Sequence, residues 1–253
     1  MVRTKWHRLI FMILLIVFWE GAVQLKFYNP ALLPSISLII ESFIKGLISG
    51  ELSRAIFYSL LVIAKGLSIS FAIASALVLL SRAKAWLDDL LTLVMTIAHP
   101  LPGIAILPLV ILWFGIGEKA ILFVVVHSML WPIVLTLREG VIRLHQQYAR
   151  IGTAFNLTLK KRIYHLYFMG SMPSLLTGAK MGWSRGWRAF ISAEMVFGIV
   201  GERSGLGWYL FEQRVYFDAP GLYAGLIAII MCGVLIEKVL FEKIEKGIGL
   251  RWS

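Results

Sequence analysis

Long blocks of apolar residues constrain this chain more than any other feature of its sequence. Six blocks are long enough, or nearly so, for the ~20 apolar residues that a helix needs to cross a ~30 Å hydrocarbon layer. They lie at about 9–28, 55–80, 87–114, 120–137, 167–200 and 219–240. Of the 253 residues only 15% are charged, against about 25% in an average soluble domain. The sequence therefore predicts an all-α polytopic membrane protein with about six transmembrane helices.

The first 54 residues predict a membrane span followed by an interfacial helix. The basic segment Met1–Arg8 precedes an apolar run that lacks a small-residue cleavage site, so we expect a retained span and not a cleaved signal peptide. Segment 35–49 has apolar residues at helical spacing on one face but is too short to span comfortably, which favours a helix lying at the interface.

The expected third span, 87–114, contains several residues that break helices. Pro100, Pro102, Gly103 and Pro108 predict a kinked or discontinuous helix, which membranes tolerate only where protein or a cavity satisfies the freed backbone groups. The fifth span is long enough to include a break near Gly182–Gly186. With no internal repeat or flexible linker, we expect a single transmembrane domain over 1–253, in which 55–245 form the core bundle.

The distribution of lysine and arginine predicts the orientation of the chain. With the N-terminus inside, fifteen of the 25 basic residues fall in interior segments, six in exterior segments and four within spans. Basic residues collect on the cytoplasmic side of membrane spans. We therefore expect both termini in the cytoplasm, together with a strongly basic interior loop at 138–167.

The sequence lacks the motifs of several function classes. It contains no G-x-x-x-x-G-K-[ST] phosphate loop, no H-E-x-x-H or paired-cysteine metal spacing and no nucleophile motif, so we expect neither an enzyme nor a metal site. Cys232 is the single cysteine, which excludes a disulfide within the chain. A net charge of +11 would suggest nucleic acid in a soluble protein, but the membrane explains it, and no nucleic acid partner is expected.

The interior loop at 138–167 is unusually long for a connection between bundle helices. Residues from Ala149 to Ala154 are compatible with a helix, Phe155-Asn156-Leu157 interrupts it, and a helical pattern resumes at Leu159. Such a helix–turn–helix would present an apolar protrusion that fits a groove of a soluble partner. From the residues alone, an ordinary basic loop against anionic lipid head groups is an equally good reading.

This segment resembles the cytoplasmic coupling loop, or EAA loop, of permease subunits in bacterial ABC importers. Aligning the second of the family loop's two Leu-Pro pairs on Met172-Pro173 puts Arg150-Ile151-Gly152 at the E-A-A positions and Asn156 at the family's turn glycine. Asparagine enters the left-handed backbone region more often than most residues, so the turn can form without the glycine. The resemblance implies that the ATPase-coupling residues are Ala149, Arg150, Ile151, Gly152, Ala154, Phe155, Asn156, Leu157 and Leu159.

Nearly the whole chain resembles the nitrate/sulfonate/taurine-type permease family. The matching segments are LLPS at 32–35, PLPGIAILPLVILWFGIGEKA at 100–120, LLTGAKMGWSRGW at 175–187, SAEMVFG at 192–198 and SGLGWYLFE at 204–212. The resemblance implies a type I ABC importer fold in the bacterial inner membrane. It also implies a homodimer that works with two cytoplasmic ATPase subunits, which bind ATP and Mg, and with an extracytoplasmic solute-binding protein. No cofactor is expected on this chain itself.

Charged residues inside predicted spans are candidates for the solute pathway, because they are costly in a membrane. The fifth span carries Lys180, Arg185, Arg188 and Glu194, interleaved with aromatic side chains. A cationic, aromatic-edged pathway would favour a small anion such as nitrate, a sulfonate, taurine or bicarbonate. Our pathway candidates are Arg185, Trp187, Arg188, Glu194, His99 and Pro102.

Other readings of these residues remain open. Either arginine could pair with Glu194 or with carbonyls at a helix break, and Lys65 could extend to the interface. His99 and His127 are more typical of buried hydrogen-bonding residues than of ligands, and Trp131 of a packing residue. The segment Gly205, Leu206, Gly207 and Trp208 is either a gate or binding-protein contact, or an ordinary tight turn.

Two other function classes have to be weighed. An ion-coupled secondary transporter would need no ATPase, but the inverted repeats and midplane carboxylates typical of that class are not apparent. A purely structural scaffold would need neither a broken third span nor charges in the fifth.

Overall fold

The computed structural model describes residues 3–25, 32–154, 170–197 and 204–252, and every element in these ranges is helical. The predicted all-α class is confirmed. The first elements are α1 (Arg3–Gln24), α2 (Ile36–Ile48), α3 (Glu51–Ser81), α4 (Ala85–Ala98), the 3-10 turn η1 (Gly103–Ile106) and α5 (Leu107–Phe114). They are followed by α6 (Glu118–Ala154), α8 (Met172–Phe197), α9 (Leu206–Val215), α10 (Ala219–Leu235), the π-helical η3 (Ile236–Phe241) and α11 (Glu242–Trp252).

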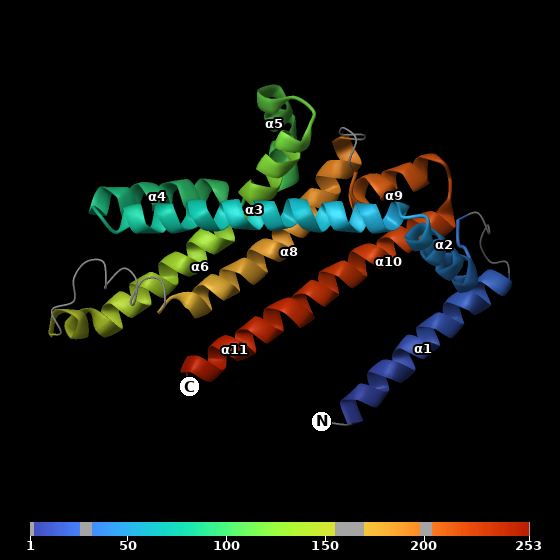
Figure 1. The fold of residues 1–253 in the computed structure, drawn as a ribbon, viewed down its shortest axis with the longest axis horizontal. Coiled ribbons are helices and arrows are strands. Elements are labelled where there is room, and N and C mark those ends of the chain that lie inside the picture. The colour runs from blue at the N-terminus through green and yellow to red at the C-terminus, as the bar shows by residue number, and fades with distance from the viewer. Residues whose placement is uncertain (1–2, 26–31, 155–169, 198–203, 253) are drawn as a thin grey trace.

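The most extensive packing in the bundle is between α6 and α8, and α3 packs against both of them (Figure 1). Three glycines of α8 are spaced four residues apart, at Gly178, Gly182 and Gly186. A Cβ at Gly178 would fall against Thr136 Oγ1 and 3.1 Å from Ile133 Cα, and one at Gly182 would lie 3.2 Å from the Met129 carbonyl oxygen. Small residues at this spacing let two helix backbones approach closely. The predicted break near Gly182–Gly186 is therefore wrong, because these glycines serve helix contact and α8 is continuous.

Helix α6 extends far beyond the predicted fourth span. It runs for 37 residues from Glu118 to Ala154, so residues 138–154 continue a helix where the sequence predicted the start of a loop. Within this continuation Arg138 donates from Nε and Nη2 to the two carboxylate oxygens of Asp88 on α4, at 2.9 and 2.6 Å. This two-point ion pair is one that arginine geometry favours, and it ties α4 to α6.

The third span is broken, as its proline and glycine content predicted. Helix α4 ends at Ala98, and the next helical segment, Gly103–Phe114, is bent from it by 90°. Figure 1 shows α5 leaving the plane in which α3 and α4 lie side by side. The irregular residues between the two pieces line a cavity together with residues of α6 and α8.

Three described helical segments are long and apolar enough to cross a membrane: α3, the first part of α6 (Glu118–Leu144) and α10 continued into α11 (Ala219–Gly247). The bent pair formed by α4 with η1 and α5 makes a fourth if it counts as one span. The other two expected spans correspond to α1 and α8. In α1 the apolar part found is the short segment Ile13–Gln24, and α8 carries the four charged residues noted above.

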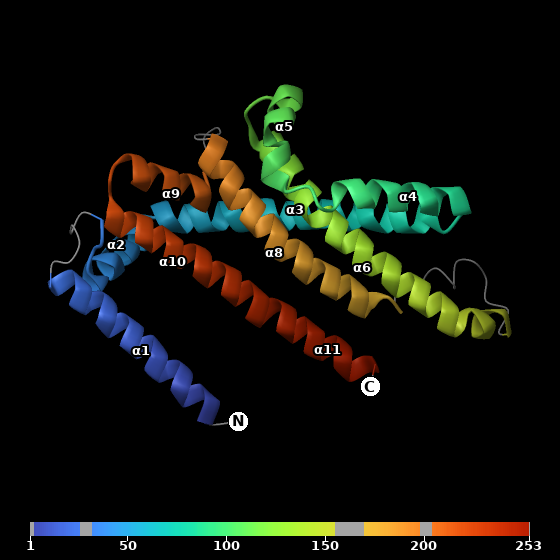
Figure 2. The same cartoon turned by 180° about the vertical axis from the view of Figure 1, so that it is seen from behind.

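Helices α1 and α2 lie at the edge of the bundle, and contacts join the end of α1 to the start of α2. Trp19 Nε1 donates to the Pro34 carbonyl at 3.1 Å, and the Ile36 amide donates to Glu20 at 3.1 Å. Large apolar side chains on the rest of α1 are exposed, including Phe18 at 78%, as expected of a surface that faces lipid or another subunit. Figure 2 shows that the start of α1 and the end of α11 lie at the same side of the bundle.

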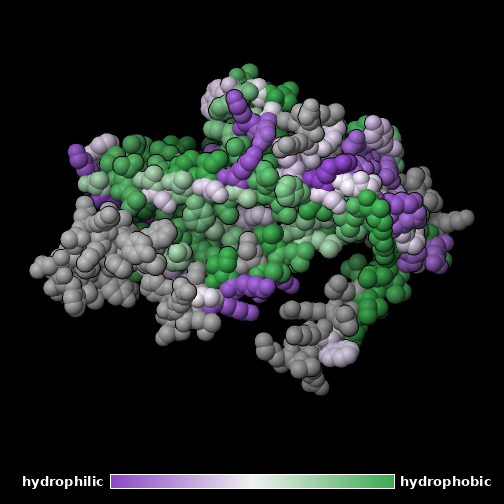
Figure 3. Space-filling view, in the orientation of Figure 1, coloured by the Kyte–Doolittle hydropathy of each residue, from purple (hydrophilic) through white to green (hydrophobic). Residues whose placement is uncertain are grey.

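Apolar residues cover a continuous band on the face of the molecule in Figure 3, over α3 and α4. Hydrophilic residues gather at the end where α2 and α9 lie. Large exposed apolar patches mark contact with a membrane or with another protein, so this distribution agrees with a bundle embedded in lipid.

Candidate functional site

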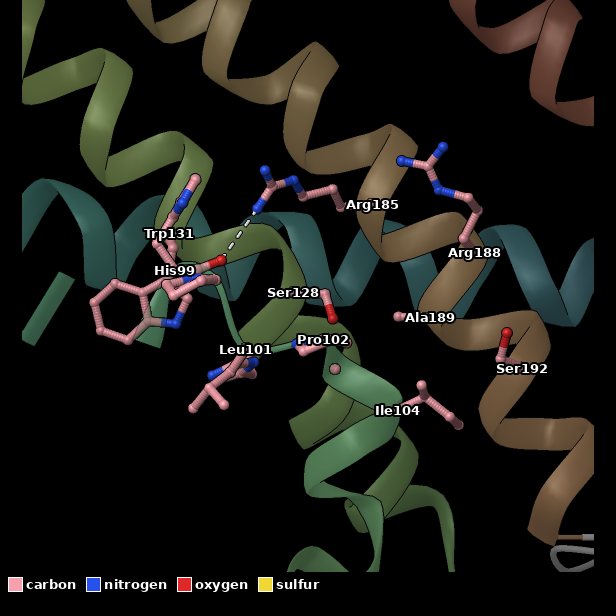
Figure 4. A pocket seen from close by; sticks show the side chains of 13 residues that line it. His99, Leu101, Pro102, Ile104, Ser128, Trp131, Arg185, Arg188, Ala189 and Ser192 are labelled. Carbon is pink, nitrogen blue, oxygen red and sulfur yellow. Dashed lines mark hydrogen bonds between the residues drawn. The ribbon is translucent and has the colours of Figure 1, made fainter. Parts of the chain in front are cut away.

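A cavity of about 460 Å³ lies where the third span is broken (Figure 4). The end of α4 and the start of η1 form one wall, and α6 and α8 form the others. The cavity is lined by His99, Pro100, Leu101, Pro102, Gly103, Ile104, His127, Ser128, Trp131, Arg185, Arg188, Ala189 and Ser192. Four of the six predicted pathway residues thus lie together: His99, Pro102, Arg185 and Arg188.

The two arginines supply the positive charge of this cavity. Arg185 Nη1 donates to the carbonyl oxygen of His99 at 3.4 Å, which satisfies one backbone group freed by the break, and Figure 4 shows this bond between α8 and the broken span. Arg188 lies one helical turn further along α8 and is exposed. Within the described part of the chain, neither arginine forms an ion pair and no carboxylate lines the cavity. Both charges are therefore available to an anion.

Three further polar groups of the cavity lack a hydrogen-bond partner among the described residues. They are His99 Nε2, His127 Nδ1 and Trp131 Nε1, all shielded from solvent. Trp131 is only 9% exposed, and a buried indole N–H normally finds an acceptor. The sequence favoured buried, hydrogen-bonded histidines and a packing role for Trp131. Neither interpretation accounts for three polar atoms without a hydrogen-bond partner among the described residues.

His127 and Trp131 were not among the pathway residues predicted from the sequence. Both lie on α6 with Ser128, and residues three or four apart share one helix face. The spacing H-S-x-x-W within an apolar run is the one sequence signal for these two residues. Its meaning depends on the tertiary structure, which brings this face of α6 to the same cavity as the break in the third span.

The structure places the other two predicted pathway residues away from this cavity. The Trp187 ring is buried and stacks on Trp183 at a centroid distance of 5.7 Å. Glu194 is also buried, and its two carboxylate oxygens accept hydrogen bonds from the amides of Gly205 at 2.8 Å and Gly207 at 2.9 Å. Glu194 pairs with backbone amides and not with an arginine, so its contacts are those of an anchor.

This anchor holds the segment before α9 against α8 and α3. Between the two glycines, the Leu206 amide donates to Ser59 Oγ of α3 at 2.9 Å. A Cβ at Gly205 or Gly207 would collide with Glu194, which explains the glycine at both positions. Gly205, Leu206 and Gly207 are buried, so they do not form an exposed contact surface in this conformation, whereas Trp208 is half-buried and stacks on Phe211.

Replacing Glu194 with alanine should destabilise the permease clearly. Two buried amides would lose their acceptor, each at a cost of about 1–3 kcal/mol. Glu194→Gln keeps an acceptor oxygen and should lose less stability, and Glu245→Ala, on the exposed surface of α11, is the matched control. Thermal unfolding in detergent measures the effect, and solute uptake by Glu194→Gln at the wild-type rate would agree with an anchoring role. A variant that unfolds normally but no longer transports would instead restore Glu194 to the pathway.

A second cavity of about 690 Å³ lies at the N-terminal end of α3, beside Ser204. Glu51, Ser53 and Arg54 contribute its polar lining. Burial, and next the negative charge of Glu51, raise the pKa of the Glu212 carboxyl in the neighbouring α9. Charged groups of both signs are thus concentrated at this end of the bundle.

Lys65 and Lys180 each pair with a carboxylate away from the cavity. Lys65 Nζ lies 3.2 Å from Glu118, and Lys180 Nζ lies 3.7 Å from Glu237. Both pairs are at least one-third exposed, and exposed pairs contribute little to stability.

The predicted coupling residues fall partly outside the described residues. Ala149, Arg150, Ile151, Gly152 and Ala154 form the last part of α6. Phe155, Asn156, Leu157 and Leu159 lie beyond the described part of the chain, so the predicted turn and its contacts remain a prediction.

A bundle of apolar helices around a cationic cavity at a broken span is the architecture of a membrane transport protein. Comparison with protein families gives its class: residues 66–248 match the model of the binding-protein-dependent transport system inner membrane component. This match covers most of the chain, which therefore belongs to that family of ABC transporter permeases and has the type I ABC importer permease fold. It is a multi-pass inner-membrane transport subunit.

Individual relatives match almost the entire chain at low identity. The putative aliphatic sulfonates transport permease protein SsuC of Escherichia coli (strain K12) is 26% identical over 94% of this chain and 89% of its own length. The formylaminopyrimidine transport permease protein ThiX of Halalkalibacterium halodurans is 25% identical over 89% of this chain and 88% of its own. The taurine transport system permease protein TauC of Escherichia coli (strain K12) is 23% identical over 89% and 82%.

Proposed function

We propose that this chain forms one half of the translocation pathway of an ATP-driven importer for a small anionic solute. The observation that carries the proposal is the cavity at the break of the third span, where Arg185 and Arg188 lie without a carboxylate partner among the described residues. Charged groups inside a membrane bundle mark solute pathways. One of the relatives above is named for aliphatic sulfonates, which agrees with an anion.

The proposed complex contains a second copy of the permease, two cytoplasmic ATPase subunits and an extracytoplasmic solute-binding protein. ATP and Mg are bound by the ATPase subunits, and this chain carries no catalytic residue. The ATPases dock on the coupling segment 149–159, with both termini on the same cytoplasmic side. The binding protein docks at the opposite end, near α9 and the second cavity. The positions of the termini in Figures 1 and 2 support this orientation.

Helix α6 supplies a direct mechanical connection between the ATPases and the cavity. It contributes His127, Ser128 and Trp131 to the cavity and continues to Ala154. At 1.5 Å per residue, Trp131 and Ala149 are separated by about 27 Å along one helix. The tight glycine-mediated contact with α8 means that movement of α6 also moves Arg185 and Arg188.

ATP-driven closure of the two ATPases would displace the coupling segment and switch the cavity from inward-facing to outward-facing. Such transitions occur between two discrete packings, which a remote ligand biases. The role of the permease side chains is to bind the solute weakly and to change access to it. Proton transfer or covalent chemistry is not required of them.

Co-purification tests this proposal. After mild detergent extraction from the native membrane, the tagged permease should retain an ATP-binding subunit, and the ATPase activity of the complex should rise when the solute-loaded binding protein is added. A permease that purifies without any ATP-binding subunit, yet transports in response to an ion gradient, would instead be a secondary transporter.

A further inference from the structure

We propose that the ion pair between Arg138 and Asp88 positions the α4 wall of the cavity, so that this wall moves together with the coupling end of α6. The pair thereby makes access to the cavity depend on the state of the ATPases. This inference rests on the proposed function, because it needs an ATPase that displaces the coupling segment. It assigns a positioning role to two residues that lie outside the lining of the cavity.

This ion pair differs from the other ion pairs of the described residues in geometry and in burial. Arg138 donates to both carboxylate oxygens of Asp88, and its Nη2 also donates to Thr92 Oγ1, one turn further along α4, at 3.2 Å. The two charged side chains are 20% and 25% exposed, whereas those of the other pairs are at least 39% exposed. A two-point, largely buried contact fixes both the distance and the orientation of the groups that it joins.

Stability alone is a poor explanation for a pair of this kind. Charges are costly to remove from water, and replacing a buried ion pair with apolar residues of similar volume is often neutral or even stabilising. Helix α4 is already anchored by Leu91 and Met95, which are buried in the apolar core. What the pair adds is a fixed position of the start of α4 relative to one point on α6.

The place of the pair along the two helices connects the coupling segment with the cavity. On α6, Arg138 lies between Trp131 of the cavity and Ala149 of the coupling segment, about 10 Å from the first and about 16 Å from the second at 1.5 Å per residue. On α4, Asp88 lies in the first turn, and the helix continues to Ala98, directly before the break. A displacement of the coupling end of α6 therefore reaches α4 at its start, on the way to the cavity.

With this pair, every wall of the cavity has a connection to the coupling segment. Helix α6 is itself one wall, and α8 follows it through the close contacts at Gly178 and Gly182. Helix α4 is held at both ends, by Asp88 to α6 and by the His99 carbonyl to Arg185 of α8. Without the pair, the start of α4 is free to stay behind when α6 moves. The ATPases would then still hydrolyse ATP, but hydrolysis would no longer switch the access to the cavity.

Labelling of a cysteine in the cavity measures this switch without a solute. The full complex, with Ser192→Cys in the lining and Cys232→Ala, would be treated in right-side-out vesicles with an external, membrane-impermeant methanethiosulfonate reagent that bears a sulfonate. The vesicles contain either no nucleotide or ATP, Mg and vanadate, which arrests the closed ATPases. With Arg138 and Asp88 intact, we expect nucleotide to speed labelling about tenfold, and Asp88→Asn to reduce this to less than about twofold. Glu139→Gln, at an exposed acid that forms no ion pair among the described residues, is the matched control and should keep the full response.

Further measurements separate positioning from a structural role. Asp88→Asn should retain its ATPase subunits and their ATP hydrolysis, and Arg138→Lys, which keeps both charges but not the two-point contact, should also lose most of the labelling response. The reversed pair, Asp88→Arg with Arg138→Asp, should recover at least part of it. A full response in either single variant, no recovery in the reversed pair, or loss of the ATPase from both single variants would overturn this inference. A complex without substitutions at the pair that does not respond to ATP would instead refute the proposed function.

Discussion

Replacing Phe155 and Leu157 with aspartate is expected to abolish association of the permease with its ATPase subunits and, with it, all ATP-driven transport. If both apolar side chains fill a groove of the ATPase, each substitution removes about 1.5–3 kcal/mol of favourable apolar burial. Each aspartate also introduces a charge that has to be desolvated on binding. The combined loss corresponds to at least a thousandfold weaker binding. Co-purification of the complex from the membrane measures it directly.

Two controls separate this effect from a failure to fold. The conservative variant Phe155→Leu with Leu157→Met keeps the apolar character and should retain the ATPase. The aspartate variant should still insert in the membrane and elute as a monodisperse permease. Normal assembly of the aspartate variant would show that the coupling contact lies elsewhere than 149–159.

Valine at Gly178 is expected to prevent the permease from reaching its folded state in useful amounts. Its Cβ would fall against Thr136 Oγ1 and within 3.1 Å of the Ile133 backbone, so α6 would have to move as a whole. Overpacking of this kind costs about 3 kcal/mol or more, which is a large part of the stability of a typical domain. Fluorescence-detected gel filtration of a tagged protein measures the folded yield.

Gly21→Val is the matched control for this prediction. Gly21 is also a helical glycine, but an added Cβ there would meet no atom within 4 Å, and valine is no worse a helix former than glycine. Its folded yield should stay near that of the wild type. A Gly178→Val permease with wild-type yield would contradict the tight α6–α8 contact on which the mechanical connection depends.

The break in the third span could be predicted from the sequence because proline acts locally. Its missing N–H and fixed φ disfavour a helix interior, so the closely spaced Pro100 and Pro102 indicated the break without knowledge of the fold. A lone proline is a weaker signal, since Pro132 lies inside the continuous α6. The glycines of α8 act differently. Whether a glycine breaks a helix or allows close packing depends on whether another helix lies beside it. In this structure α6 packs closely on these glycines, so they are contact residues and not helix breakers.

The limits of the site prediction have the same origin. Arg185 and Arg188 were recognisable because a charge inside an apolar span is unusual in any fold. Glu194 has the same local signature, but its function as an anchor depends on the amides of Gly205 and Gly207, eleven and thirteen residues away. Trp131 resembled ordinary packing because only the tertiary structure shows that its N–H has no hydrogen-bond partner among the described residues.

The length of α6 was underestimated for a related reason. Arg138 looked like the first residue of a basic loop, since a charge follows the apolar run at that point. In the structure its ion pair with Asp88 of α4 allows the helix to continue past the end of the apolar segment. A charge at the end of a span thus marked a contact between helices and not the end of a helix.

Solute uptake into proteoliposomes is the most direct test of ATP-driven transport through this chain. The permease would be reconstituted with its ATPase and binding protein, and uptake would be compared with ATP, with a non-hydrolysable ATP analogue, and with the ATPase left out. We predict uptake only in the presence of both hydrolysable ATP and the ATPase. Uptake that persists without the ATPase, or that follows an ion gradient alone, would contradict the assignment of this chain as the permease of an ATP-driven importer.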